Sequence, residues 1–553
     1  MTMFLRIATK RAKDSLYRYL QLCESVWENG RPRNKVLYSF GNLDAISRKS
    51  LMGLASDFSR VAGNQVFSEF DLRTDSSRIF GSTSVADRLW NDLSLSERIR
   101  RLLRPFRLDF DVALYIKVMV ANRLIDPRSK LAISEWYPRI WLPDLDGKTL
   151  SLHHFYRALD YLQKIKPSLE EELFAATRDL FNLDVDLVFY DLTSTYFEGE
   201  GPGIAEYGYS RDKRPDRKQI VVCLACDRLG FPIACEVLPG RLADVSTVVG
   251  MVGSLSERFR IRRCVFVADS GMVSQKNLAA LSDAGYQYVV ADKRRKLADA
   301  EALLSTPLDD YQDAGHSLKI LAGPPDDSGV RAICCYSAPR ATEQRQIRQA
   351  RIKKGRDGLE AIEHRVAAGR LRDGEKIIAK ASKVLVISSA EPYFNYGLRP
   401  DGSFHFEENT DRVGREERIE GRYFLSTNAA SLSASDVVDA YYTLQEVERA
   451  FRTMKDFLGL RPIRHYSQER VKAHVYVCVL AYLLEKSLEH RLKAAGVQLS
   501  AQKALDILSA VHLVDNKLGD IPVRTITRPS PQAAAVVKAA GMQPFPRVLE
   551  PTQ

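Results

Sequence analysis

Two aspartates close apolar segments near the middle of this 553-residue chain. Asp191 ends the run VDLVFYD, and Asp269 follows the apolar residues of RCVFVADS. An unpaired carboxylate at the end of a buried strand loses several kcal/mol of hydration, so we expect a positive group, most simply a metal ion, to face each acid. Either acid alone is also explained by an edge position that meets a turn or caps the next helix. Their occurrence as a pair favours the metal.

A third carboxylate follows from helical periodicity late in the chain. Large side chains recur there at alternating steps of four and three residues, at Val437, Tyr441, Leu444, Phe451 and Leu458. The same ladder passes through Glu448 and Lys455, so we expect Glu448 on the inward face of a helix. Glu446 lies two positions away, about 200° around the helix, and is expected to face elsewhere. The alternative for Glu448 is an ion pair with Arg452, four residues on.

Three carboxylates on two strands and a helix can hold two Mg(II) ions, with Mn(II) as a substitute. These hard cations keep water and substrate phosphates as their remaining oxygen ligands. Two such ions, roughly 3.5–4 Å apart, activate the attacking oxygen and stabilise the leaving one in an in-line displacement at phosphorus. The candidate chemistry is therefore phosphodiester cleavage and transfer.

The elements that must position these acids alternate between strands and helices. Three apolar runs, VDLVFYD, KQIVVCLACD and FPIACEVLPG, follow one another as strands. A helix, the strand RCVFVADS, a second helix and the strand YQYVVA come next. This β-β-β-α-β-α-β order predicts a mixed α/β sheet with helices on both faces. The helix of Glu448 begins later, with Ser433 or Ser435 as its N-cap.

The other segments show different patterns. Residues 1–70 alternate like short strands around an Asn-Gly turn, and residues 71–180 show helical periodicity with many Arg and Lys. Residues 293–430 carry strand-like runs, KVLVIS and GRYFLST, beside a basic helical stretch. We therefore divide the chain into a β-rich N-terminal unit (1–70), a helical, DNA-binding domain (71–180), the first part of the catalytic core (181–292), a β-rich insertion (293–430), the core helices that carry Glu448 (431–495) and a C-terminal region (496–553).

Composition points to a polyanionic partner. The chain has 81 Lys and Arg against 70 Asp and Glu, a net charge of +11, and nucleic acid is the leading candidate. Eight cysteines without an even framework fit a reducing cytoplasm. The longest apolar run, 475–484, is about half of the ~20 residues needed to cross a bilayer. We expect a cytoplasmic protein that does not enter a membrane.

Basic residues gather directly after the first predicted strand. The stretch YGYSRDKRPDRKQ interleaves two tyrosines with Arg211, Lys213, Arg214, Arg217 and Lys218. Such cations position DNA through its phosphates without reading the sequence, and the alternative is a solvated hairpin tip. A basic helix in the insertion offers Arg345, Arg348, Arg351, Lys353, Lys354 and Arg356 for the same purpose, although charged helices are also commonly just exposed.

Three motifs together resemble a known family. YDLTSTYFEG, VADSGMVSQKNL and YYTLQEVERAFRTMKDFLGLRPIRHY are similar to the motifs of bacterial insertion-sequence transposases of the DDE class. The resemblance is to the IS-four-type arrangement, in which a β-rich insertion precedes the last catalytic acid. It implies an α/β fold, a ribonuclease-H-like mixed sheet with flanking helices, in which Asp191, Asp269 and Glu448 are the catalytic metal ligands.

The resemblance includes a Tyr, Arg, Glu and Lys signature on the last helix. Three of its four positions agree, at Tyr441, Glu448 and Lys455. The signature implies that Tyr441 and Lys455 contact DNA phosphates, and the alternative for Tyr441 is packing in the core. Leu444 stands where the signature has Arg, so we expect Arg452 together with Lys455 to grip the phosphate instead.

The implied protein binds the terminal inverted repeats of its own element and pairs them in a homodimeric synaptic complex. It cuts this double-stranded DNA and joins the 3′ ends to target DNA, in the bacterial cytoplasm and on the nucleoid when bound. One alternative is an inactive or domesticated transposase-derived DNA-binding protein, against which the presence of all three acids argues. Another is a different ribonuclease-H-like nuclease, against which the long insertion before Glu448 argues.

Overall fold

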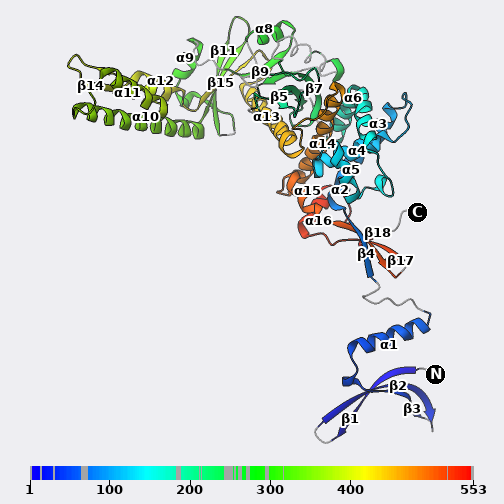
Figure 1. The fold of residues 1–553 in the computed structure, drawn as a ribbon. Helices are drawn as coiled ribbons and strands as arrows, with labels where there is room; N and C mark the ends of the chain where they lie inside the picture. Colours follow the sequence, from blue (N-terminus) through cyan, green and yellow to red (C-terminus); the bar gives the residue numbers. More distant parts are fainter. Residues whose placement is uncertain are drawn as a thin grey trace. The chain divides into compact units, whose positions relative to one another are not determined.

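The computed structural model describes residues 3–12, 15–28, 31–63, 72–181, 188–208, 210, 212, 214–241, 253, 257–259, 265–268, 275–292, 298–315, 317–519 and 521–549. The chain divides into two compact units. The smaller unit comprises Met1–Ile79, Val511–Arg528 and Phe545–Gln553, and the larger one comprises Phe80–Ala510 and Pro529–Pro544. Figure 1 labels their helices and strands, and each unit is described by itself below.

The described part of the smaller unit contains two antiparallel sheets. One is formed by β1 (Met3–Ala12), β2 (Ser15–Glu28) and β3 (Arg31–Asn42), which α1 (Arg48–Val61) follows. The predicted Asn29-Gly30 turn lies outside the described residues, between the paired residues Glu28 and Arg31. The second sheet joins segments that are far apart in the sequence, in the order β18 (Val548–Leu549), β17 (Ile521–Ile526), β16 (His512–Leu518) and β4 (Leu72–Ile79).

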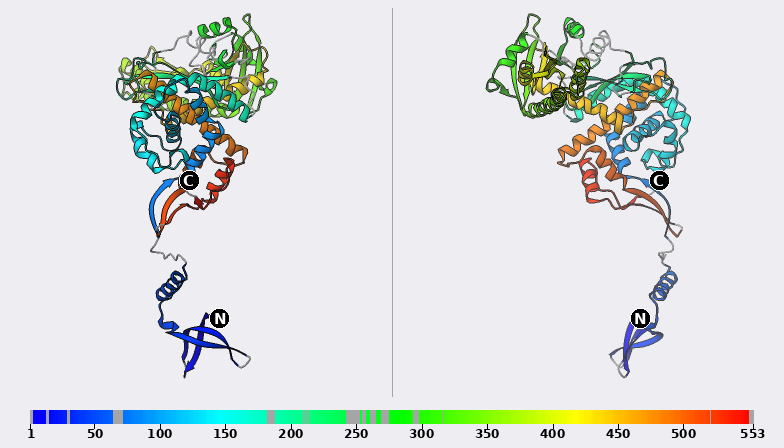
Figure 2. Two further views of the ribbon diagram at one scale, coloured as in Figure 1. Left: turned by 90° about the vertical axis from the view of Figure 1, so that its right-hand side faces the viewer. Right: turned by 60° about the vertical axis from the view of Figure 1, so that its left-hand side comes forward.

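A helical bundle forms one part of the larger unit. Its members are α2 (Gly81–Asp92), α3 (Leu95–Leu102), α4 (Val112–Ile125), α5 (Lys130–Trp136), α6 (Leu152–Phe181) and, from late in the chain, α14 (Gln468–Ala494), α15 (Ala501–Ser509) and α16 (Pro531–Ala539). Nearly every residue of α4 is buried, as expected for a helix that is apolar on all sides. The helix α14 contacts α2, α4 and α6, and both views of Figure 2 show these helices together. None of the helices in the described residues is long and apolar enough to span a membrane.

The five predicted strands of the central sheet follow one another along the chain as expected, and the helix predicted between the third and fourth of them, at residues 244–259, lies largely outside the described residues. Among the described residues its nine strands run β10-β11-β12-β15-β9-β8-β5-β6-β7. The meander β5 (Val188–Tyr196), β6 (Gln219–Cys226) and β7 (Pro232–Pro239) is antiparallel, whereas β8 (Val265–Ala268) is parallel to β5, and β9 (Gln287–Asp292) is parallel to β8. The helix α8 (Gln275–Asp283) connects β8 to β9. This is the expected ribonuclease-H-like mixed sheet.

The segment predicted as an insertion extends this sheet and then leaves it. After α9 (Ala298–Ser305), the strands β10 (Gln312–Asp313), β11 (Leu318–Pro325), β12 (Arg331–Ser337) and β15 (Arg422–Thr427) continue the sheet beyond β9. Between β12 and β15 lie α10 (Ala338–Ala367), α11 (Gly374–Ser388), the hairpin of β13 (Phe394–Leu398) and β14 (Phe404–Glu408), and α12 (Thr410–Ile419). This excursion has its own hydrophobic core.

One predicted strand in this segment is a helix. The run KVLVIS, at residues 383–388, lies inside α11 and not in a strand. Ile377, Ala381 and Leu385 are buried at steps of four residues against α10 and the β13–β14 hairpin. The apolar run is too short to show this helical period, because two of the four buried positions of α11, Ile377 and Ala381, precede it.

Candidate active site and nucleic-acid interface

The helix α13 (Ala434–Arg452) lies across the strands that carry the first two acids. It contacts β5, β8 and β9, and Figure 1 shows it next to β5 and β9. Ser433 is its N-cap, one of the two predicted candidates. The Asp436 N–H donates to Ser433 Oγ at 3.1 Å, and the Ser433 N–H donates to the Asp436 carboxylate at 2.9 Å. This reciprocal pair fixes where the helix starts and therefore which residues face the sheet.

Asp191 lies within β5 and not at its end. The strand continues to Tyr196, and Asp191 is paired with Leu224 of β6. The predicted strand end was wrong because the polar residues 193–195 are buried in the sheet, and β-branched threonines suit a strand. Nothing is described of the Asp191 side chain. Asp269 directly follows β8 and lies outside the described residues.

The register of β5 and β8 bears on both aspartates. Val188 pairs with Phe266 and Phe189 with Val267, so the partners in these parallel strands differ by 78 positions (266 − 188 and 267 − 189). Asp191 and Asp269 also differ by 78 positions (269 − 191). Residues that are paired in neighbouring strands point to the same face of a sheet. The two acids therefore have sequence positions that suit a shared site.

Glu448 lies on the exposed side of α13, so the prediction that it faces inward was wrong. The buried stripe is Val437, Ala440, Leu444, Val447, Phe451 and, beyond the helix, Met454 and Leu458. Ala440 and Val447 are buried in place of Tyr441 and Glu448, the neighbouring positions that were predicted to face inward. Tyr441, Glu448 and Lys455 consequently form one margin of the stripe rather than its centre.

Glu446 has a separate partner. Its carboxylate accepts a hydrogen bond from Lys486 Nζ of α14 at 2.8 Å, and Arg449 lies 3.4 Å from its other oxygen. Partial burial opposes its charged form, but the hydrogen bond and charge of Lys486, together with the charges of Arg449 and Lys493, outweigh this and lower the pKa of Glu446. This acid holds α13 against α14, and it faces away from the margin of Glu448 as predicted.

Lys455 joins the end of the helix to the loop that follows β5. It lies in a π-helical turn, Thr453–Phe457, that continues α13. Its Nζ is 2.7 Å from the carboxylate of Asp212, which is 4% exposed and also lies 2.7 Å from Arg461. The prediction overlooked Asp212, although a single acid among the cations of SRDKR is a visible signal. Farther along, the Ile463 N–H donates to Tyr196 O at 3.3 Å, at the end of β5.

The basic loop after β5 is largely neutralised by its own acids. Arg214 makes two hydrogen bonds of 2.8 Å with Asp216, and these lower the pKa of Asp216 to about 2. Lys218 lies 2.5 Å from Glu200, and Arg217 lies 3.6 Å from Glu198. Arg211 and Lys213 lie outside the described residues.

The other signature positions differ in exposure. Tyr441 is half-buried, and its ring centroid lies 6.3 Å from that of Tyr423 on β15. Leu444 is buried, so the position at which the family has Arg has no room here for a charge. Arg452 is exposed and forms no ion pair with any described residue. The predicted alternative, a pair between Glu448 and Arg452, is therefore absent from the described part of the chain.

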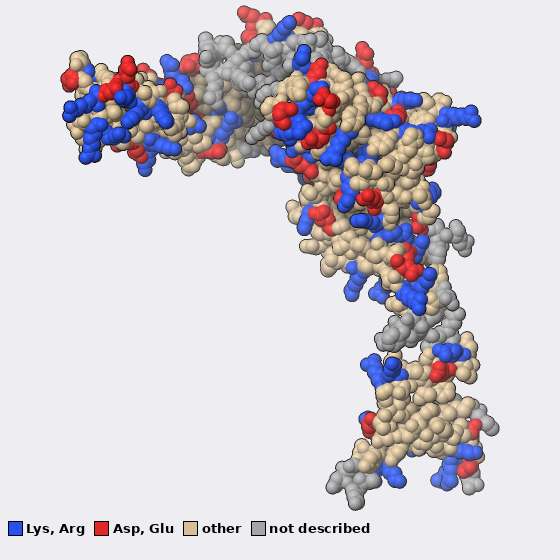
Figure 3. All heavy atoms as spheres, viewed as in Figure 1, with Lys and Arg blue, Asp and Glu red and all other residues tan. Residues whose placement is uncertain are grey.

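The basic helix α10 offers a second set of cations. Figure 3 shows Lys and Arg side chains gathered over the part of the molecule that carries it. Arg348 is buried and pairs with Glu420 at 2.6 Å, so it has a structural role. By contrast, Arg351, Lys353 and Lys354 are exposed and form no ion pair within the described residues. Of the six cations predicted to clamp DNA from this helix, these three are available to an anionic partner, and Arg365 farther along α10 is likewise exposed without an ion pair in the described part of the chain.

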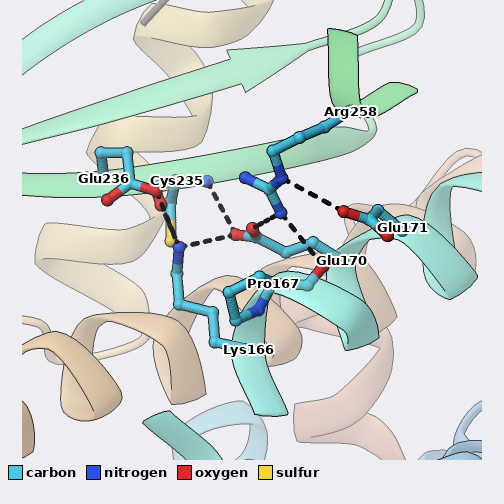
Figure 4. Close-up of polar contacts among 7 residues, drawn as sticks. All are labelled: Lys166, Pro167, Glu170, Glu171, Cys235, Glu236 and Arg258. Atoms are coloured by element: carbon cyan, nitrogen blue, oxygen red, sulfur yellow. Dashed lines mark hydrogen bonds and ion pairs between the residues drawn. The ribbon is translucent and has the colours of Figure 1, made fainter. Parts of the chain in front are cut away.

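A buried ion-pair network holds the helical bundle against the core sheet (Figure 4). Glu170 of α6 is 2% exposed and lies 3.0 Å from both Lys166 and Arg258. Its carboxylate also accepts the Cys235 N–H of β7 at 3.1 Å, and Lys166 donates to the Cys235 carbonyl at 2.5 Å. Because every charge in this network has a partner, we assign it a structural role, in holding α6 against β7, and no part in the chemistry.

Among the described side chains, no group of three His, Cys, Asp or Glu residues is placed to hold a metal ion. Two of the three predicted ligands are not among these side chains, because the side chain of Asp191 and all of Asp269 lie outside the described residues. The donor set itself, three carboxylates, suits a hard divalent cation. Asp191 and Asp269 share the register offset of their strands, which is compatible with a common ion.

A ribonuclease-H-like sheet crossed by an acid-bearing helix is a frame for cutting and joining nucleic acid. Two family models match this chain: Transposase DDE domain over residues 185–484, and IS1634 family transposase, N-terminal domain over residues 5–63. Since the first match covers more than half of the sequence, the chain belongs to the DDE transposase family. The protein is a DNA transposase, an enzyme that binds DNA, depends on divalent metal ions, and cleaves and transfers DNA strands.

Solved transposase structures resemble the chain only weakly. The piggyBac transposase synaptic complex with hairpin DNA is 11% identical, with 77% of this chain and 79% of that chain covered and a TM-score of 0.36. The Mos1 transposase paired-end complex with left transposon end is 13% identical, with 32% and 57% covered and a TM-score of 0.15. Neither TM-score is high enough to carry an argument about this chain. The comparison with curated proteins gives no significant match.

Proposed function

We propose that Asp191, Asp269 and Glu448 form the catalytic metal site of this transposase, with Mg(II) as the natural ion and Mn(II) as a substitute. The observation that carries the proposal is the common offset of 78 positions between the paired residues of β5 and β8 and between the two aspartates. It supports two carboxylates on one face of neighbouring strands. When bound, the ions activate the attacking oxygen and stabilise the leaving oxygen at phosphorus.

The contacts at the two ends of the α13 margin support Glu448 as the third ligand. Tyr441 contacts Tyr423 of β15, and Lys455 contacts Asp212 in the loop after β5. In the sheet, β9 and β8 lie between β15 and β5. Glu448 is midway between Tyr441 and Lys455, so its position along the helix falls over these middle strands. Glu448 is exposed on this side of the helix, whereas Glu446 is held against α14 by Lys486.

The proposed substrate is double-stranded DNA at the terminal inverted repeats of the element that encodes the protein, together with target DNA. We propose that two copies of the chain pair these ends in a homodimeric synaptic complex. The exposed cations support contact with DNA phosphates. Arg452 lies four residues after Glu448 on α13, whereas the nearer Arg449 is paired with Glu446 and Glu489. In the loop after β5 each described cation has an acid partner, so we expect a smaller contribution per residue there.

The test of this function is nicking and joining of DNA that carries the sequences flanking the coding region. Full-length protein is expected to nick at the ends of short inverted repeats in Mg(II) or Mn(II) and to join the released 3′ ends to a second duplex. DNA without these ends is the control. Equal cutting of both substrates, or no cutting with either ion, would contradict the proposal.

A further inference from the structure

A basic cavity lies between the helical bundle and the segment that joins α13 to α14. Its volume is about 560 Å³, and its lining comes from α4, α5, α6 and residues 459–474. Five of the described lining residues are Arg or Lys, two are His, and none is Asp or Glu. Such a lining is unusual for the inside of a protein, where buried cations normally have acid partners.

Three buried nitrogen atoms in this lining have no hydrogen-bond partner in the described part of the chain. They are Arg123 Nε, Lys130 Nζ and His474 Nδ1, on residues that are 5%, 3% and 4% exposed. The remaining bonds of the Arg123 guanidinium go to the backbone carbonyls of Gly459 and Arg128, at 2.8 Å each, and of Leu458 at 3.4 Å, and not to a carboxylate. Since buried polar atoms are almost always bonded, three such atoms on residues that line one cavity indicate a missing hydrogen-bonding ligand.

The acids close to the cavity are already used. Arg128 pairs with Asp126 at 2.7 Å, and Arg470 pairs with Asp160 at 2.8 Å. Arg461 is shared between Asp212 and Asp456. These pairs leave Lys130, Arg123 and the exposed Arg464 without a neutralising acid among the described residues. Burial, followed by repulsion from Arg123, lowers the pKa of Lys130 well below its usual value.

Lys117 shows what a buried lysine looks like when the chain supplies its partners. It is 3% exposed, as Lys130 is. Its Nζ lies 2.5 Å from Asp87 and 2.6 Å from Asp144. Two lysines of equal burial in one helical bundle therefore differ in whether their counter-ion is built into the protein. For Lys130, the described residues supply no counter-ion.

We propose that this cavity binds a phosphate group, carried either by DNA or by a free nucleotide. A guanidinium fork and a lysine ammonium are the donors that phosphate oxygens favour. The volume exceeds that of a lone ion, and the ring of Tyr156 in the lining offers a flat apolar surface for an attached group.

The place of the cavity favours DNA as the source. The lining residues Arg461 and Pro462 adjoin Ile463, which bonds to the end of β5. Phe197, which bridges to Ile463, is six residues from Asp191, or about 20 Å along an extended strand. A DNA strand that leaves the candidate active site can therefore reach the cavity within a few nucleotides. This source rests on the proposed function, whereas the phosphate site itself does not.

Thermal unfolding of the full chain in inorganic phosphate tests the proposal, with chloride of equal ionic strength as the reference. Phosphate is expected to raise the Tm of the wild type by mass action. Lys130→Met should unfold at a higher Tm than the wild type without phosphate, because it removes an unpaired buried cation, and it should lose the phosphate response. Lys130→Arg should keep the response.

Lys117→Met is the matched control. It leaves two carboxylates unpaired, so it should lower the Tm while the phosphate response persists. If Lys130→Met does not fold, Arg464→Gln decides the question: it should leave the Tm without phosphate unchanged and weaken the response several-fold. A phosphate response no larger than that in chloride, or equal responses in the wild type and the folded cavity variant, would overturn the proposal.

Two further measurements distinguish the sources of the phosphate. If it belongs to DNA, Lys130→Met should weaken duplex binding and reduce the salt slope by about 0.9, the value for one phosphate contact. If it belongs to a nucleotide, dAMP should raise the Tm more than inorganic phosphate does, and duplex binding should be unchanged. A wild type that responds to phosphate but does not cut element ends would contradict the proposed function alone.

Discussion

Lys455 Nζ lies 2.7 Å from the carboxylate of Asp212, which ties the end of the α13 segment to the loop that follows the strand of Asp191. The same carboxylate holds Arg461, in the segment that leads on to α14. One buried acid therefore links three parts of the chain around the candidate active site. Lys455 is therefore partly engaged in this structural ion pair. Arg452, which is exposed, is the cation of this helix that is available to a phosphate.

Asp212→Asn is expected to loosen this link. Removing the charge takes this ion pair away from Lys455, whose side chain is 10% exposed, and breaking such a pair typically costs about 3–5 kcal/mol. Urea unfolding should show the loss of stability, and single-turnover nicking should slow while end binding persists. Asp216→Asn, an exposed acid of the same loop, is the control and should change the stability much less, because its pair with Arg214 is open to solvent. Equal effects of the two variants would show that Asp212 has no special role.

Asp269→Asn and Glu448→Gln are expected to lose strand cleavage by at least about 100-fold, as the removal of a charge-stabilising group does in other enzymes. Both should keep end binding, because the basic surfaces are unchanged. Nicking and gel-shift assays on one substrate make the comparison. Glu446→Gln is the matched control on the same helix: it should cleave normally while losing about 1.5–3 kcal/mol of stability with the Lys486 bond. Reversed behaviour of the two glutamate variants would show that the wrong margin of α13 was assigned.

Arg452→Ala is expected to reduce cleavage or joining by about tenfold, with a smaller effect on binding, because a charge-assisted bond to phosphate is worth roughly 1.5–3 kcal/mol. Single-turnover assays of end cleavage and joining are the measurement. Leu444→Arg should not rescue it, since Leu444 is buried and a charge there destabilises the helix packing. Wild-type rates in Arg452→Ala would remove this residue from the site.

Salt dependence compares the two basic segments. Replacing Arg351, Lys353 and Lys354 by Gln should lower the slope of log affinity against log salt by up to about 2.7, or 0.9 for each phosphate contact. The same change at Arg214, Arg217 and Lys218 should weaken binding to all DNA but flatten the slope less, because these cations have acid partners. A larger change from the second set would mean that DNA displaces those acids.

His465→Gln is expected to flatten the pH dependence of stability. Burial, and then the charges of Lys130, Arg123 and Arg470, lower the pKa of His465 to about 3. The unfolded chain takes up this proton near pH 6.5 and the folded chain does not, so wild-type stability falls as the pH drops from about 6.5 towards 3. The difference in Tm between wild type and variant, followed from pH 7 to 5, isolates this group. Parallel curves would show that His465 titrates normally.

The core sheet was predictable because its apolar strands are contiguous runs separated by turns, and strand order follows from such runs. The capped start of α13 was predictable for a similar reason, since Ser433 and Asp436 are close in sequence. Features that depend on distant partners were not. The helical state of residues 383–388 depends on packing against α10, and the exposure of Glu448 depends on which side of its helix the sheet covers. The proposed division of the chain into six segments stays a prediction.

The pairing of β4 with β16 imposes a delay during synthesis, because the two strands are far apart in the sequence. β4 ends at Ile79 and its partner begins at His512, 433 residues later (512 − 79). At about 5–20 residues per second, the strand waits roughly 20–90 s for its neighbour to be made. During that time its edge is unpaired, and a product that stops before residue 512 never closes this sheet. Completion of this sheet thus requires that translation has passed residue 518, the end of β16.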